Sequence, residues 1–163
     1  QAIEELRLSV RGLTGDAAPL ADALADWRSE TVSRLMAASI EVQWDAEGTP
    51  DDVHIPASLR TQLTRILREA VSNVIRHSGA RHCRINLTLQ AGVLRLDVHD
   101  DGRGVAVAAD GAVTRHAGGM GLANMERRAH KLGGHYALAT SAMGGVHVQV
   151  RVPLDQSATI AAT

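Results

Sequence analysis

The sequence predicts an α+β fold, a two-layer α/β sandwich in which helices pack on one face of a mixed β-sheet. Four segments alternate between apolar and polar residues, which is the pattern of half-buried strands. Segments with apolar residues three to four apart, typical of helices, come before and between them. Hydrophobic residues make up 45% and charged residues 21% of the 163 residues, so a packed core is expected.

The N-terminal part of the chain is predicted to form two helices and one strand. Residues 1–13 have apolar side chains at helical spacing, and the same spacing predicts a second helix over 20–38. The expected core residues of this second helix are Leu20, Leu24, Trp27, Leu35 and Met36. Residues 40–45 alternate between apolar and polar and predict a strand, which the polar loop 46–52 follows.

A long helix is predicted over residues 56–78. Pro56 suits its first turn, where the missing N–H has no helical partner to lose, and Gly79 is a typical residue to end it. At about 100° per residue, the apolar side chains share one face of this helix. The expected core face consists of Leu59, Leu63, Leu67, Ala70 and Val74.

Two strands, 83–90 and 94–98, are predicted next. Ala91-Gly92 joins them, which favours a β-hairpin. The side chains expected to face the core are Cys83, Ile85, Leu87, Leu89, Leu94, Leu96 and Val98. Arg95, Asp97 and His99 are expected on the opposite, polar face of the sheet.

The C-terminal part is predicted to form a loop, a helix and two strands. Residues 101–119 are rich in glycine without a clear period and predict a loop. A helix is predicted over 122–132, ended by Gly133 and Gly134. Strands are predicted over 136–140 and 146–152, and the last residues, 155–163, are expected to form a tail.

Charge and cysteine content limit the classes of partner and of covalent cross-link that the chain can have. The chain has 17 basic and 18 acidic residues and a net charge of -1, so nothing favours nucleic acid or an anionic membrane as a partner. The single cysteine, Cys83, excludes an intrachain disulfide and favours a reducing compartment. No apolar run approaches the roughly 18–20 residues that span a bilayer. Because the chain begins at Gln1, we expect it to be a piece of a longer protein.

The long helix has a polar stripe suited to phosphate chemistry. Glu69, Asn73 and Arg76 fall within roughly 60° of one another on the helical wheel, with His77 at the edge. An amide oxygen can ligate Mg²⁺, a carboxylate can accept a proton, and a guanidinium can pair with phosphate. The alternative is a solvated polar stripe, which the helix by itself leaves open.

Two glycine clusters come after the hairpin. Asp100 stands at a strand end before Gly102 and Gly104, an arrangement that would let a carboxylate and exposed backbone bind a base. An ordinary Asp-Gly turn is the alternative. The second cluster, Gly118 to Leu122, precedes a predicted helix, whose first N–H groups could bind phosphate, or it is a hinge. Neither cluster is a P-loop or a dinucleotide fingerprint.

The order of these three pieces is more specific than any one of them. The segment from Glu69 to His77 resembles the N box of the GHKL ATPase superfamily, which has the Bergerat fold. The segment from Asp100 to Gly104 resembles its first glycine box, and Gly119 to Leu122 resembles its second. The resemblance covers roughly residues 20–154 and is strongest to sensor histidine kinases of the nitrate-sensor type.

The resemblance implies ATP as substrate and Mg²⁺ as cofactor. It implies that Asp100 binds the adenine amino group, Asn73 ligates Mg²⁺, and Glu69 assists proton removal as the catalytic residue. Arg76 and His77 would face the phosphates. The remaining ATP-binding residues would be Gly102, Gly104, Gly119, Met120, Gly121 and Leu122. The family often has Gly-Gly-Thr where this chain has Gly-Gly-Val146, so a hydroxyl near the adenine is missing.

The resemblance also implies a domain organisation and partners. Residues 1–15 would be the end of a dimerisation helix and a linker, 16–154 the ATP-binding catalytic domain, and 155–163 a tail. The phosphoryl group would pass to a histidine on a dimerisation domain, and then to a response regulator. The full-length protein would be a homodimer and a membrane-bound bacterial sensor with this part in the cytoplasm, whereas the fragment would be a monomer. An anti-sigma-factor serine kinase or a nucleotide-binding module without catalysis are the alternatives.

Overall fold

A computed structural model describes residues 17–104, 106–107, 113–114 and 119–154, and within them it confirms the two-layer α+β fold. The sheet has five strands in the order β2-β4-β5-β9-β8. They are β2 (Glu41–Glu47), β4 (His82–Gln90), β5 (Val93–Asp100), β8 (His135–Thr140) and β9 (Val146–Pro153). Only the β2–β4 pair among these strands is parallel, so the sheet is mixed as predicted.

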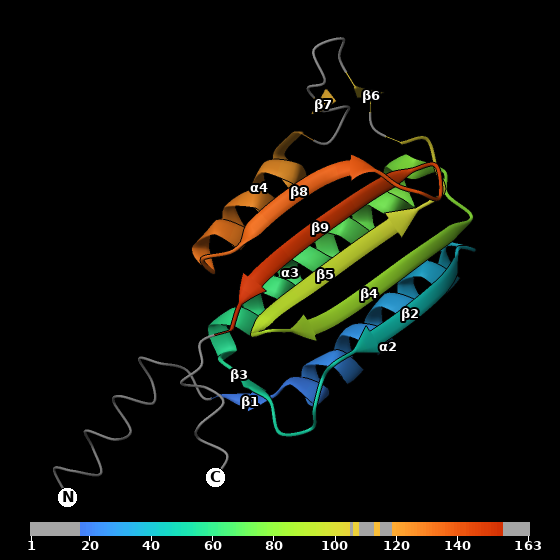
Figure 1. Ribbon diagram of the computed structural model, residues 1–163. Helices are drawn as coiled ribbons and strands as arrows, with labels where there is room; N and C mark the ends of the chain where they lie inside the picture. The colour runs from blue at the N-terminus through green and yellow to red at the C-terminus, as the bar shows by residue number, and fades with distance from the viewer. Residues whose placement is uncertain (1–16, 105, 108–112, 115–118, 155–163) are drawn as a thin grey trace, which may run out of the picture.

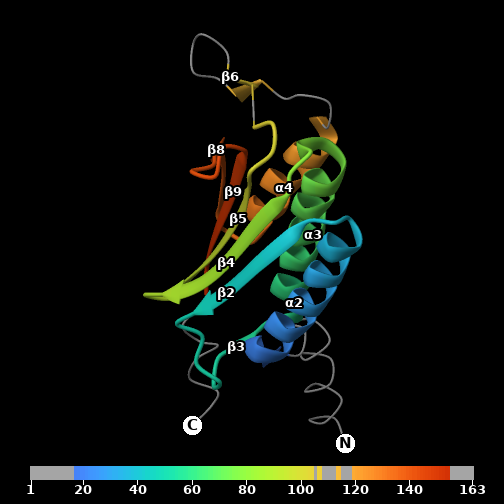
Figure 2. The ribbon, with the colours of Figure 1, turned by 90° about the vertical axis from the view of Figure 1, so that its right-hand side faces the viewer.

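Three helices cover one face of the sheet, as the side view shows (Figure 2). They are α2 (Leu20–Ala37), α3 (Ala57–Asn73) and α4 (Gly119–Lys131). The short strands β1 (Ala18–Pro19) and β3 (His54–Ile55) pair at the start of α2 and α3. The predicted helix 1–13 and the tail 155–163 lie outside the described residues, and no described helix is long and apolar enough to span a membrane.

The core lies between the helices and the sheet and contains most of the residues that the periodicity predicted, with Leu24 and Leu89 only partly buried. The predicted core face of α3 is buried throughout, and Cys83, Ile85 and Leu87 of β4 face it. Burial raises the pKa of the Cys83 thiol to about 12, so this cysteine stays an uncharged core residue. Met36 of α2 was predicted in the core but is 65% exposed. Thr31 is buried instead, because it lies one turn from both Trp27 and Leu35.

The predicted hairpin is confirmed with its turn. Gln90 pairs with Val93 across a two-residue connection. Ala91 and Gly92 both have positive φ angles, 52° and 74°. Two consecutive positive φ angles are the backbone of a type I′ turn, whose twist matches that of antiparallel strands.

Several element boundaries differ from the prediction, and two short strands are added. The long helix is α-helical only to Asn73, and Val74–Ser78 continue as a π-helix, η1. Helix α4 begins at Gly119, three residues before the predicted start, so its glycines are helical. The predicted loop contains two short paired strands, β6 (Ala106–Val107) and β7 (Val113–Thr114), beyond the end of the sheet (Figure 1). The polar segment after Trp44 continues β2 to Glu47, where backbone pairing with β4 outweighs the lack of apolar side chains.

The outer face of the sheet is polar as predicted, but it contains one buried carboxylate. Asp97 is 4% exposed and accepts hydrogen bonds from Arg95, His147 and Gln149. Burial acts to raise the pKa of Asp97, and these hydrogen bonds outweigh burial and hold that pKa below its usual range. The His147 ring also stacks on His99, with centroids 3.8 Å apart. The hydrogen bonds to Asp97 therefore offset the cost of burying its charged carboxylate in the sheet.

Candidate functional site

The C-terminal end of β5 holds a buried carboxylate, Asp100, which is 3% exposed. One of its oxygens, Oδ1, accepts hydrogen bonds from the backbone N–H groups of Gly102 at 2.9 Å and Val146 at 3.3 Å. The described residues donate no hydrogen bond to its other oxygen, Oδ2. Burial raises the pKa of Asp100. One oxygen thus orients the side chain, and the described residues leave the other without a donor.

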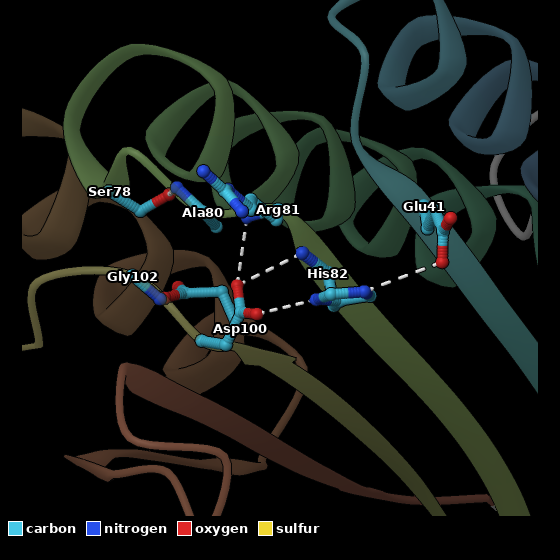
Figure 3. Close-up of polar contacts among 8 residues, drawn as sticks. Glu41, Ser78, Ala80, Arg81, His82, Asp100 and Gly102 are labelled. Carbon is cyan, nitrogen blue, oxygen red and sulfur yellow. Dashed lines mark hydrogen bonds and ion pairs between the residues drawn. The ribbon is translucent and has the colours of Figure 1, made fainter.

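Glycines allow the backbone to close around Asp100. A Cβ on Gly145 would overlap the side-chain oxygen and the carbonyl oxygen of Asp100. A Cβ on Gly102 would overlap the carbonyl of Ser78, the last residue of η1. Figure 3 shows Gly102 beside Ser78. These contacts require glycine for steric reasons, and they join the end of β5 to the end of the long helix.

Ser78 and Gly79 end the helix and start the next strand. The Ser78 carbonyl accepts a hydrogen bond from the N–H of Arg103 at 2.9 Å, and its hydroxyl accepts one from the N–H of Ala80 at 3.0 Å. Gly79 has a φ of 63°, the left-handed conformation that favours glycine at a helix end. The predicted helix end at Gly79 is confirmed, and it positions the first glycine cluster.

The second aspartate of this segment, Asp101, binds the start of β4. Its Oδ1 accepts hydrogen bonds from the N–H groups of Arg81 and His82, both at 2.9 Å, and its Oδ2 lies 2.6 Å from Nδ1 of His82. The His82 ring also lies 3.4 Å from Glu41 on β2, which Figure 3 shows. These contacts, the backbone bond from His82 foremost, lower the pKa of Asp101 to about 2, and the hydrogen bond to Asp101 raises the pKa of His82.

The predicted stripe on the long helix is present, in two parts. Glu69 and Asn73 are half-buried on α3, one turn apart, whereas Arg76 and His77 are exposed on η1. No described residue hydrogen-bonds to the side chains of Asn73, Arg76 or His77. The π-turn widens the helix after Asn73, so the sequence-based angle between Asn73 and Arg76 does not hold.

The second glycine cluster lies against the stripe. Gly121 is in the first turn of α4, and a Cβ there would overlap the carboxylate of Glu69. Leu122 packs against the core, which fixes this first turn. Gly119 begins the helix and Met120 follows it. Gly104 ends the other cluster with a φ of 75°. The structure thus brings Glu69 to the start of α4, and Asp100 to the end of η1.

Sequence reasoning missed the steric role of Gly145 and the Asp101–His82 pair. Gly145 was noted only as part of a resemblance, because no local pattern says that a glycine 45 positions after Asp100 touches it. Asp101 follows Asp100 directly, and in an alternating strand the next side chain points to the other side. That alternation was the available signal for Asp101 having a different role.

The comparison with known families shows the family to which the chain belongs. The family described as histidine kinase-, DNA gyrase B-, and HSP90-like ATPase matches residues 58–156, which include both glycine clusters and the stripe. The chain belongs to this family. The matched region contains Glu69, Asn73, Asp100 and Gly121.

Sensor histidine kinases are among the relatives of this ATPase domain. The chain is 33% identical over 134 residues to sensor histidine kinase LnrJ of Bacillus subtilis (strain 168), covering 82% of this chain and 30% of LnrJ. It is 32% identical over 115 residues to sensor histidine kinase LiaS of the same strain, covering 71% of this chain and 29% of LiaS. The chain therefore spans less than a third of these two relatives.

Solved structures show the same fold. The catalytic domain of histidine kinase ThkA matches with a TM-score of 0.66 at 16% identity, over 85% of this chain and 95% of that one. Full-length ShkA in complex with AMPPNP matches with a TM-score of 0.66 at 21% identity, over 85% of this chain and 31% of that one. The domain is thus of the kind that sensor histidine kinases use as their ATPase domain.

Proposed function

We propose that this chain is the catalytic domain of a two-component sensor histidine kinase, which binds ATP and donates its γ-phosphoryl group to a histidine on a dimerisation domain. The observation that carries the proposal is the juxtaposition of two sets of residues. Asp100 with its glycine cradle adjoins the end of η1, and Glu69, one turn before Asn73 on α3, adjoins the start of α4. The match to ShkA supports ATP, because that kinase was solved with the ATP analogue AMPPNP.

Asp100 is proposed to bind the adenine. Its Oδ2, to which no described residue donates, can accept a hydrogen bond from an exocyclic amino group, while Gly102 and Val146 hold Oδ1. The Val146 contact uses the backbone N–H, so this part of the cradle does not need the hydroxyl of a threonine at position 146. Gly102 and Gly145 let the backbone pack closely around the Asp100 carboxylate, which holds it in this orientation.

Asn73 is proposed to hold the magnesium ion. Asn73 is half-buried, and its side chain has no partner among the described residues, which fits a hard-cation ligand. Mg²⁺ would neutralise phosphate charge when bound. Arg76 and His77, exposed one turn on, are proposed to pair with phosphate oxygens, and the start of α4 from Gly119 to Leu122 would supply backbone N–H groups.

Glu69 is proposed as the catalytic residue. In the transfer, the bond from the γ-phosphorus to its bridging oxygen breaks, a bond to the imidazole nitrogen forms, and ADP leaves. The proton lost by the imidazole has to be accepted, and Glu69 is the carboxylate nearest to Asn73 along α3. Most of the rate would still come from positioning and charge neutralisation.

The relatives support the wider assignment. The named relatives are sensor histidine kinases, so a response regulator and a dimerisation domain are proposed as partners. We extend this to a nitrate-sensor-type kinase in which residues 1–15 end the dimerisation helix and 16–154 form the catalytic domain. A membrane-bound homodimer with this domain in the cytoplasm is proposed for the full-length protein.

Calorimetry with a non-hydrolysable ATP analogue and Mg²⁺ tests the nucleotide site. Wild type should bind, and Asp100→Asn should weaken binding by at least about tenfold, because its amide N–H₂ would face the adenine amino group. Asp51→Asn is the control, because it removes the charge of an exposed aspartate far from the site. Absence of binding by folded wild type would refute the proposal. In the full-length protein, an acid-labile phosphoryl product would identify histidine, and an acid-stable one would favour serine.

A further inference from the structure

The outer face of the sheet carries a cluster of side chains that can ligate a metal ion. Asp97 and His99 are two residues apart on β5, so their side chains point to the same face. On β9, His147 pairs with His99, and Gln149 pairs with Asp97. The described helices all pack on the opposite face of the sheet, as Figure 2 shows, so none of them closes over this cluster.

Backbone pairing fixes the spacing of the cluster. Each of β5 and β9 has a paired strand on both sides, so neither strand is an edge of the sheet. One ligand atom from each of Asp97, His99 and His147 lies within 4.8 Å of the other two. Tetrahedral zinc bonds of about 2.0–2.1 Å place two ligand atoms about 3.3 Å apart. Small side-chain rotations are therefore enough to bring the three atoms to one ion, without a change in the backbone.

The two histidine rings are already partly oriented for this role. Nδ1 of His99 lies 3.1 Å from the buried Ser141 hydroxyl, which leaves Nε2 of His99 as its ligand atom. Metal-binding histidines usually have such a hydrogen bond at their second ring nitrogen. The His99 and His147 rings are stacked with centroids 3.8 Å apart. Since the terminal torsion of a histidine side chain is broad, turning these rings toward one point costs little.

The ligand types determine which class of ion fits. Oδ1 of Asp97 lies 2.6 Å from Nε2 of His147, and Gln149 and Arg95 also donate to this oxygen. Arg95 bonds the second oxygen as well, so the carboxylate is held in place from two sides. Mg²⁺ and Ca²⁺ require several oxygen ligands, and this cluster offers one carboxylate. Two imidazole nitrogens with one carboxylate oxygen suit a transition metal such as Zn²⁺.

We propose that Asp97, His99 and His147 bind a divalent transition-metal ion of the zinc class. The ligands are Nε2 of both histidines and Oδ1 of the aspartate. The ion replaces the hydrogen between His147 and Asp97, and the displaced proton moves to Nδ1 of His147 or to solvent. The bound ion joins β5 to β9 on the outer face, so it stabilises the folded domain. This site involves no nucleotide and is independent of the proposed kinase function.

A zinc titration of the 163-residue chain tests the site, with Mg²⁺ in excess to occupy oxygen-rich sites. Calorimetry should show one tightly bound Zn²⁺ per chain. The thermal unfolding midpoint should rise by about 5–10 °C when free Zn²⁺ is about 100 times its dissociation constant. His99→Gln should lower the zinc affinity at least about tenfold. His135→Gln is the matched control, because it removes an exposed histidine from β8 of the same sheet, and it should bind Zn²⁺ as wild type does.

NMR of the imidazole rings detects the site in wild type without any substitution. The resonances of His99 and His147 should change together as one equivalent of Zn²⁺ is added. Equal zinc affinities of wild type and folded His99→Gln would overturn the proposal. Changes confined to His82, which lies between Asp101 and Glu41, would also overturn it and assign the zinc to that position. Thermal unfolding without metal verifies the folding of His99→Gln, and the NMR result decides if that variant does not fold.

Discussion

The carboxylate of Glu69 on α3 lies so close to Gly121 on α4 that a methyl group at position 121 would occupy the place of Oε1. The contact joins the helix with the proposed catalytic and magnesium-binding residues to the first turn of the helix that is proposed to face the phosphates. The identity of residue 121 therefore determines where the Glu69 carboxylate can be.

Gly121→Ala should impair catalysis far more than stability. The overlapping atom is the end of a flexible side chain, so Glu69 can turn away at a cost of about 1 kcal/mol or less. Phosphoryl transfer by the full-length protein should fall at least about tenfold, because the carboxylate is displaced. Urea unfolding and transfer rates measure the two effects. In Glu69→Gln, the added Gly121→Ala should change little further; an additive loss would contradict the coupling.

Gly145→Ala should damage both the fold and the nucleotide site. Its Cβ would meet the carbonyl oxygen and side chain of Asp100 and the N–H of Gly102, and backbone cannot move aside as a side chain can. We expect a loss of about 1–3 kcal/mol in the free energy of unfolding. Affinity for the ATP analogue should drop sharply in calorimetry. Ala142→Ser is the control, because it enlarges an exposed side chain in the same loop. If Gly145→Ala binds the ATP analogue with wild-type affinity, the packing of Gly145 on Asp100 has no part in nucleotide binding.

The Asp101–His82 pair should make stability depend on pH in two windows. The pKa of Asp101 is lowered to about 2, so its stabilisation is present above pH 4 and is lost as pH falls toward 2. The pKa of His82 is raised, so its stabilisation is complete below pH 6.5 and is lost as pH rises through the raised value.

Urea unfolding of wild type and Asp101→Asn from pH 2 to pH 8 measures this effect. The difference between them should be largest between pH 4 and pH 6.5, where both groups are charged. Asp51→Asn, an exposed aspartate, is the matched control and should follow wild type. A difference between wild type and Asp101→Asn that is constant over the whole range would contradict the assignment.

Asp97→Ala should destabilise the domain without altering nucleotide binding. The change leaves the buried donors of His147 and Gln149 without an acceptor, which should cost about 2–3 kcal/mol. Asp45→Ala, on the outer face of the edge strand β2, should cost less than about 1 kcal/mol. Thermal unfolding and calorimetry give the two readouts. A fall in nucleotide affinity of folded Asp97→Ala would assign the outer face a part in the ATP site.

Residue patterns predicted most of the fold, and where they failed the reason was tertiary packing. The core face of α3 and the Ala91-Gly92 hairpin followed from periodicity and turn chemistry. Met36 was misplaced because a helical wheel gives an angle but not the position of the neighbouring strand. The start of α4 was misplaced because glycine disfavours helix in isolation, whereas here the first turn packs through Leu122.

The sequence by itself determined the two-layer fold, the order of the motifs and the residue types suited to binding ATP. Their chemistry and spacing follow from the chain alone, because periodicity and side-chain type are local properties. Only the tertiary structure decided that Gly145 closes on Asp100 and that Gly121 touches Glu69. These contacts join residues far apart in the chain. They depend on how helices and strands pack, and no local pattern encodes that packing.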